Sequence, residues 1–236
     1  MLTETRKQRE IREREARILD VAKSHLLHGG YLGLSMDRIA AEMQYSKGTI
    51  YQHFHNKEEI LLALANDAQQ KRSQMFATAA ATAGTPRQRA AAIAAAAEVF
   101  VERFSHYFMV EQIVRISSIW EKTSDERRHV MRTCETRCMA IVAGIVRDGV
   151  ASGDLTLGDG LQPEDVVFGM WSLYLGAQTI LASSDSLQEI GIRNGGSALR
   201  HNVNRMLDGH RWSPLSGEFD YSAHIDRIKN EVFSNE

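Results

Sequence analysis

Apolar residues in the first third of the chain recur every three or four positions rather than every second position. Ile18, Ala22 and Leu26 share one face of a helix predicted over residues 17–28, which the glycine pair at 29–30 ends. This period is typical of an amphipathic α-helix that packs on a core through one face. The pattern therefore predicts that the chain starts with a helical domain.

Three more helices are predicted before residue 80, and each begins at a residue with a good capping side chain. Ser35 caps a helix over 35–43, and Ser46 caps one over 46–54. Asn56 caps a longer helix that continues to about residue 78. The residues expected to face the core are Ile39, Ala40, Met43, Ile50, Phe54, Ile60, Leu61, Leu64 and Ala68.

The rest of the chain keeps the helical period and contains only three prolines. The predicted helices cover residues 87–107, 124–152, 164–184 and 197–207, and a last one after Pro214 carries Ile225, Ile228 and Val232. No run of β-branched residues bounded by turns interrupts this pattern. The sequence thus predicts an all-α fold.

Only Gln44 and Tyr45 separate the helices predicted over 35–43 and 46–54. A connection this short forces two helices to cross as in a helix-turn-helix, whose second helix enters the major groove of DNA. A plain αα-hairpin inside a bundle is the alternative. It leaves the basic, aromatic and imidazole side chains of "SKGTIYQHFHNK" without a role.

The residue types in the second helix suit the two kinds of DNA contact. Lys47 can reach a base edge or a phosphate, Gly48 allows the backbone to approach the duplex, and Thr49 can bond a phosphate. Tyr51 and Gln52 are expected on the same exposed side. His53 and Lys57 are expected to flank the groove, next to the N-terminus of the fourth helix.

Residues 17–64 resemble the DNA-binding region of the TetR family of transcriptional regulators, through "RILDVAKSHLLHGGYLGLSMDRIAAEM" and "SKGTIYQHFHNKEEIL". The resemblance implies a homodimer with a three-helix DNA-binding head and a helical body that binds a small molecule. The DNA contacts it implies are Ser35, Lys47, Gly48, Thr49, Tyr51, Gln52, His53 and Lys57, with Arg38 as a weaker candidate. Gln44 departs from the family, which commonly has Gly at this left-handed turn position, and we expect a cost of about 1 kcal/mol.

Charge separates the predicted head from the predicted body. Residues 1–57 carry a formal charge of +3 and residues 58–236 one of −5, which gives −2 overall. We therefore expect domains at 1–55 and 56–236, with residues 1–16 as an N-terminal arm. Two interpretations of the arm stay open, a contact with DNA and a solvated extension of the first helix.

Aromatic and methionine side chains are frequent in the predicted body. Most must be core, but such adaptable side chains also suit an apolar ligand cavity, and they lie on the helices that surround the effector in the resembled family. The predicted pocket residues are Phe100, Phe104, Tyr107, Phe108, Ile116, Trp120, Met139, Trp171 and Tyr174. Candidate polar anchors are Glu102, His106, Glu111, Gln112 and Arg115.

The helix predicted over 164–184 is apolar nearly all round, so it must be covered on every side. A second copy of the chain offers that cover. Together with the helix over 197–207, it is expected to form the four-helix dimer bundle that the resemblance implies.

Other classes of function find less support in the sequence. Cys134 and Cys138 share a helix face and allow a metal or thiol sensor, but no second Cys/His pair has matching spacing, so buried inert cysteines are the simpler interpretation. No cofactor is expected, and motifs of common enzymes are missing. No run reaches the ~18 apolar residues of a membrane span, and no signal peptide is recognised, so we expect a cytoplasmic protein.

The sequence therefore predicts a DNA-binding regulator, in the first place a repressor that a small and largely apolar effector releases from a palindromic operator in double-stranded DNA. The alternative is a helical protein that binds small molecules, or senses thiols or metal, and carries a vestigial head. Only the first predicts salt-dependent binding to an inverted repeat.

Overall fold

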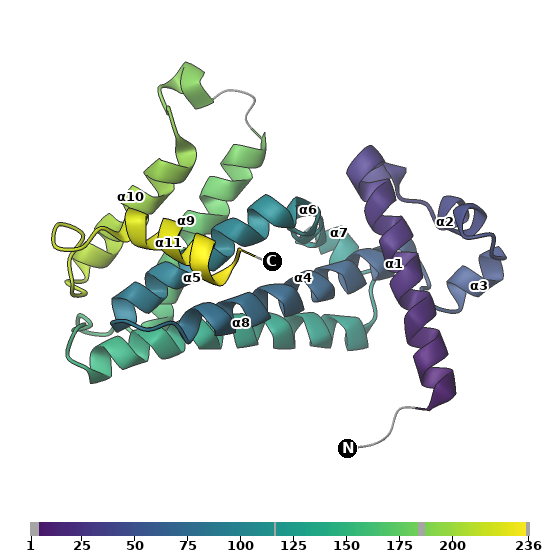
Figure 1. Ribbon diagram of the computed structural model, residues 1–236. Helices are drawn as coiled ribbons and strands as arrows, with labels where there is room; N and C mark the ends of the chain where they lie inside the picture. Colours follow the sequence, from purple (N-terminus) through teal and green to yellow (C-terminus); the bar gives the residue numbers. More distant parts are fainter. Residues whose placement is uncertain (1–4, 116, 184–186, 235–236) are drawn as a thin grey trace. The chain divides into compact units, whose positions relative to one another are not determined.

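A computed structural model describes residues 5–115, 117–183 and 187–234. These residues form α-helices and one short 3-10 helix, and no strand occurs among them (Figure 1). The helices are α1 (Arg6–Gly33), α2 (Met36–Glu42), α3 (Lys47–Tyr51), α4 (Lys57–Ala80), α5 (Pro86–Arg103), α6 (Ser105–Val114), α7 (Ser117–Trp120), α8 (Asp125–Ala151), α9 (Pro163–Ser183), η1 (Leu187–Ile190), α10 (Gly195–Gly209) and α11 (Tyr221–Val232). The predicted all-α fold is confirmed.

The chain divides into two compact units, neither of which is one continuous segment. The head unit comprises the described residues up to Lys71 and those from Phe100 to Glu135. The body unit comprises Arg72–Val99 and the described residues from Thr136 onwards. Helices α4, α5 and α8 each contribute to both units, so this division does not coincide with the single boundary expected after residue 55.

Helix α1 is longer than the helix predicted over 17–28. It begins at Arg6, where Thr5 and Gln8 form a capping box, so the arm from residue 6 onwards is a helical extension of α1. Its later turns bury the predicted apolar face. Gly30 has a φ of +58° and interrupts the helix, and one more turn follows before Leu34.

Helices α2 and α3 cross in the predicted helix-turn-helix. Gln44 has a φ of +55°, the left-handed conformation expected at this turn. The Ser46 hydroxyl accepts a hydrogen bond from the backbone N–H of Thr49 and so caps α3, whereas the Ser35 side chain makes no capping bond to α2. Ile39, Ile50 and other residues of the predicted apolar face pack into one core with Val110, Val114, Ile119 and Met131.

The predicted helix over 87–107 is in fact two helices, α5 and α6, with a break at Phe104. Phe104 has a non-helical φ of −123° and ψ of 42°. The rings of Phe100, Phe104 and Tyr107 lie 5.7–6.3 Å apart around the break. Offset aromatic contacts at this distance stabilise the broken conformation locally, and helical periodicity alone does not reveal them.

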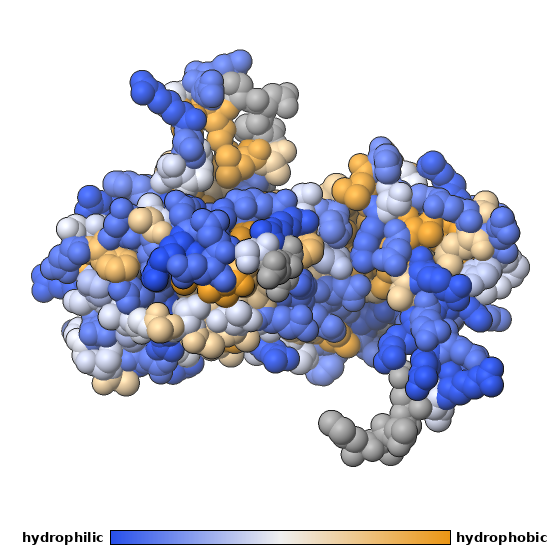
Figure 2. Space-filling view, in the orientation of Figure 1, coloured by the Kyte–Doolittle hydropathy of each residue, from blue (hydrophilic) through white to orange (hydrophobic). Residues whose placement is uncertain are grey.

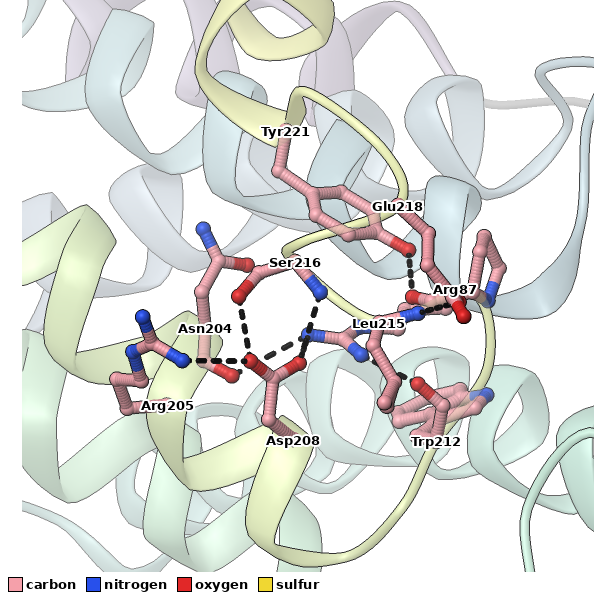
Figure 3. A network of polar contacts seen from close by, with 10 residues as sticks. Arg87, Asn204, Arg205, Asp208, Trp212, Leu215, Ser216, Glu218 and Tyr221 are labelled. Atoms are coloured by element: carbon pink, nitrogen blue, oxygen red, sulfur yellow. Dashed lines mark hydrogen bonds and ion pairs between the residues drawn. The ribbon is translucent and has the colours of Figure 1, made fainter.

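In the body unit, a buried arginine joins the start of α5 to α10 and to the segment after α10. The Arg87 side chain is 0% exposed and forms an ion pair with Asp208 of α10 at 2.6 Å. It also donates to the carbonyl groups of Trp212 and Asn204, as Figure 3 shows from close by. Since an unpaired buried charge is costly, these bonds fix the segment that leads into α11 against α5 and α10.

None of the helices in the described part of the chain is both long and apolar enough to cross a membrane.

Candidate nucleic-acid interface and ligand cavity

The outer side of α3 is exposed and polar. Lys47, Gly48 and Gln52 are exposed, and Tyr51 keeps 45% of its surface in solvent although it is a large aromatic residue. Ile50, one residue before Tyr51, is fully buried. The α3 side chains therefore separate into an anchoring face and a free face, as a DNA-reading helix requires.

Lys47 has an acidic neighbour that holds it in place. Its Nζ lies 2.6 Å from a carboxylate oxygen of Asp37, which stands in the first turn of α2. This hydrogen bond and the charge of Asp37 raise the pKa of the Lys47 ammonium group. Lys47 is thus positively charged, and it can exchange the carboxylate for another anion because both groups are exposed.

Gly48 has room for a side chain within the protein. A Cβ atom placed there would meet only the Ser46 hydroxyl, at an ordinary contact distance of 3.7 Å. Its φ is not in the left-handed region. The fold of the chain therefore does not require glycine at this position. A partner that approaches the backbone closely would require it.

Three further candidate DNA contacts differ in burial and in hydrogen bonding, namely Thr49, Ser35 and Arg38. Thr49 is half-buried and its hydroxyl shares a 2.8 Å hydrogen bond with that of Ser46. Ser35 is half-buried at the start of α2, and the exposed Arg38 donates to the carbonyl of Gly33 at 3.3 Å. All three lie in or next to the helix-turn-helix.

His53 and Lys57, which are expected to flank the groove, are less exposed than Lys47, Tyr51 and Gln52. The His53 side chain is only 6% exposed, and its Nδ1 lies 3.6 Å from a carboxylate oxygen of Glu15 in α1. Lys57 is half-buried, with its Nζ 3.9 Å from the centre of the Tyr31 ring and 3.3 Å from the Tyr31 carbonyl. Helix α1 provides both partners, Glu15 and Tyr31, which spacing within α3 and α4 cannot show.

Two buried glutamates at the start of α4 connect this helix to α1, to the segment before α8 and to the first turn of α8, within the head unit. Glu59 accepts hydrogen bonds from the backbone N–H of Ser124 at 2.5 Å and from Nε of Arg127 at 2.7 Å. Glu58 accepts from the Tyr31 hydroxyl at 2.8 Å and pairs with Lys122 at 3.4 Å.

Sequence reasoning missed this role for the two glutamates. Acidic residues in a first helical turn are explained well enough by the helix dipole, so they raise no further question. The burial of Tyr31, together with its bond to Glu58, raises the pKa of its hydroxyl to about 12. The available sequence signal was weak, because Lys122, Ser124 and Arg127 lie more than sixty residues further along the chain.

The body unit contains an apolar cavity of about 120 Å³. Helix α5 contributes small side chains to its wall, including Ala90, Ala94 and Ala97, while α8, α9, α10 and α11 contribute larger ones. Three of the nine predicted pocket residues line it, namely Met139, Trp171 and Tyr174.

Five of the other predicted pocket residues lie elsewhere, in the head unit. Phe100, Phe104 and Tyr107 form the aromatic cluster at the α5/α6 break, where Lys23 and Lys71 approach two of the rings. Phe108 is buried in α6, and Trp120 packs against the core of the helix-turn-helix. Ile116 lies outside the described residues. Aromatic content alone did not distinguish the cluster from the cavity wall.

The two cysteines and the candidate polar anchors lie outside the wall of the cavity. Cys138 is buried and Cys134 half-buried on α8, and across the described ranges no group of three or more His, Cys, Asp or Glu side chains could hold a metal ion. Of the candidate polar anchors, Glu111 is buried in α6 and none of the five lines the cavity.

Comparison with known proteins agrees with this geometry. Residues 18–64 match the family model described as bacterial regulatory proteins, tetR family. The chain thus carries the DNA-binding domain of the TetR family of transcriptional regulators, and the family predicted from the sequence is confirmed. No curated protein matches the sequence of this chain significantly.

Solved structures of transcriptional regulators share the fold over most of the chain. The TetR-family regulator PfmR from Thermus thermophilus is 20% identical and aligns over 81% of this chain and 97% of its own, with a TM-score of 0.60. A TetR/AcrR regulator from Thermobifida fusca is 23% identical over 84% and 99%, also with 0.60. The ketosteroid transcriptional regulator KstR2 of Mycobacterium tuberculosis is 15% identical over 83% and 94%, with 0.57. At these identities the comparison shows a common fold.

Proposed function

We propose that this chain is a sequence-specific repressor of transcription that binds an inverted-repeat operator as a homodimer and is released by a small apolar effector. The observation that carries the proposal is the exposed set Lys47, Gly48, Tyr51 and Gln52 on the second helix of a helix-turn-helix. A large exposed tyrosine beside a glycine that the fold does not need suggests a partner surface.

In this proposal each group on α3 has a separate task in binding DNA. Lys47 exchanges Asp37 for a phosphate or a guanine edge, and Gly48 lets the backbone come close to the duplex. Tyr51 and Gln52 contact bases or the thymine methyl group. Thr49, Ser35, Arg38 and Lys57 contact phosphates around the groove, whereas His53 supports α3 from inside through Glu15.

The apolar cavity of the body unit is the proposed effector site. It is enclosed mainly by aliphatic and aromatic side chains, which is the usual composition of a small-molecule site. Helices α4, α5 and α8 each take part in both units. A ligand that repositions them on one side of the cavity would alter how the head meets DNA.

The proposed dimer uses α9 and α10. Helix α9 leaves Phe168 61%, Ile180 51% and Leu181 36% exposed. Figure 2 shows apolar surface around the end of α9 and η1. Ile190 of η1 is 71% exposed. Burying such side chains between two copies would contribute about 25 cal/mol for each Å² of apolar surface.

Capture of genomic fragments by the full-length protein tests the proposal. A captured fragment is then titrated at about 50 and 200 mM salt, beside a scrambled fragment of equal length. We expect the protein to prefer the captured fragment at both salt concentrations and to bind it more weakly at the higher salt concentration. The captured fragment should contain an inverted repeat. Equal affinity for both fragments would favour the alternative, a helical ligand-binding protein with a vestigial head.

A further inference from the structure

The charged groups that line the apolar cavity are already paired with one another. Glu98 of α5 accepts two hydrogen bonds from the Arg200 guanidinium group, both at 2.6 Å, and a third contact from Lys229 at 3.3 Å. Arg200 also bonds Asp226 at 2.8 Å. This group of two cations and two anions is formally neutral.

Arg87, the other charged residue in the wall, is also paired with an opposite charge. Arg87 lines the cavity, but its side chain is 0% exposed and Asp208 balances its charge, while its Nε makes no hydrogen bond. Its positive charge also faces the Tyr221 ring at 4.7 Å. Figure 3 shows Asp208, Trp212 and Tyr221 gathered around it.

The tyrosine hydroxyls of the wall are engaged with the backbone. The Tyr174 hydroxyl donates to the carbonyl of Ala97 at 2.8 Å, and the Tyr221 hydroxyl donates to that of Pro214 at 2.6 Å. Trp171 adds a neutral indole to the wall, and the other polar residue there is Asn204, a half-buried residue of α10. It offers a neutral amide and no charge.

We infer that the cavity binds an uncharged apolar molecule of about one aromatic ring, with room for at most a neutral polar group near Asn204. An ionised head group would bring a buried charge to a wall whose own charges already balance, and such a charge is costly. The size follows from the volume of about 120 Å³, since a dry cavity of about 150 Å³ accommodates benzene. The inference rests on the proposed function in taking this cavity as the effector site.

A series of probes with the same skeleton and different head groups tests the charge. Ethylbenzene, 2-phenylethanol, phenylacetate and 2-phenylethylammonium are titrated into the full-length protein without DNA, by calorimetry. We expect saturable binding of the two neutral probes and at least tenfold weaker binding of both ions. Equal or tighter binding of either ion would overturn the inference, as would the absence of saturable binding by the neutral probes.

Two variants locate the binding and test the role of charge balance. Ala94→Phe fills the cavity and should abolish binding of ethylbenzene, while Ala77→Phe makes the same change at an exposed position of α4 and should leave it unchanged. Glu98→Gln removes one negative charge from the wall, and we expect phenylacetate to bind at least tenfold more tightly than to the wild type. Binding of ethylbenzene that survives Ala94→Phe, or no gain for phenylacetate in Glu98→Gln, would refute the inference.

These measurements are separate from the test of the proposed function. Binding without DNA reports on the cavity alone, whereas operator binding reports on the head. If the protein binds the neutral probes but no operator, the ligand assignment is supported and the repressor function is contradicted. A protein that binds its operator and prefers the charged probes would support the repressor function and contradict the ligand assignment.

Discussion

A single exposed ion pair, between Lys47 and Asp37, lies on the proposed DNA-binding side of α3. Lys47 and Asp37 are 67% and 55% exposed in their side chains, so solvent screens their attraction strongly. Such a pair contributes little to the stability of the fold. It orients Lys47 on the outer side of α3 and can be replaced by a phosphate at small cost.

The first prediction concerns this side of α3. Lys47→Ala and Tyr51→Ala should each weaken operator binding by about 1–3 kcal/mol, because each removes a base or phosphate contact. Thermal unfolding should stay unchanged, since both side chains are exposed. Arg205→Ala, an exposed basic residue of the body unit, is the control and should bind as the wild type does. Wild-type affinity in both α3 variants would show that this helix does not read the operator.

The second prediction concerns Tyr31, whose hydroxyl pKa is raised from its ordinary value near 10 to about 12 in the folded protein. A group that holds its proton more tightly when folded stabilises the fold below pH 10, and that contribution is lost as the pH rises towards 12. Urea unfolding at pH 8 and at pH 11 should therefore show a larger loss for the wild type than for Tyr31→Phe. An identical loss in the two proteins would contradict the contact between Tyr31 and Glu58.

At the scale of the elements, local chemistry was predictable and distant partners were not. Ser46 and Asn56 cap their helices through neighbours three residues away, so the sequence alone identified them. The break at Phe104 and the burial of His53 depend on contacts that helical period does not encode. For the same reason, the composition of the body indicated that an apolar cavity exists but identified only part of its wall.

The third prediction concerns the turn between α2 and α3. Gln44 holds a φ of +55°, which a residue with a Cβ adopts at a cost, so Gln44→Gly should stabilise the protein by about 0.5–1 kcal/mol. Chemical denaturation measures this gain. Gln44→Ala is the matched control, because it removes the same side chain and keeps the Cβ. A gain of the same size in Gln44→Ala would mean that backbone conformation is not its source.

At the scale of the whole molecule, the exposed apolar side chains of α9 form part of the proposed dimer interface. The fourth prediction uses Gly176, which is exposed on α9 and where a Cβ would meet nothing within 4 Å. The wild type should be a dimer at micromolar concentration, and Gly176→Glu should weaken the dimer because it places a charge in an apolar interface. Sedimentation measures both. Gly144→Glu is the control and should remain dimeric, since Gly144 is a half-buried position of α8 where a Cβ likewise meets nothing within 4 Å. A monomeric wild type would refute the interface.

The last prediction joins the cavity to the operator. A dimer with one reading helix in each subunit should bind half-sites about 34–36 Å apart, or one turn of DNA. A ligand that releases the dimer must bind the DNA-incompetent arrangement more tightly, and linkage then requires the operator to lower the ligand affinity by the same factor.

The test of this coupling is a pair of titrations with a compound whose binding Ala94→Phe abolishes, one with free protein and one with saturating operator. We expect a weaker affinity in the presence of the operator, by the factor with which the compound weakens operator binding. In Ala94→Phe the operator affinity should no longer respond to the compound. If the compound binds equally well with and without operator, occupancy of the cavity does not regulate DNA binding, and the assignment of α3 as the reading helix stands without it.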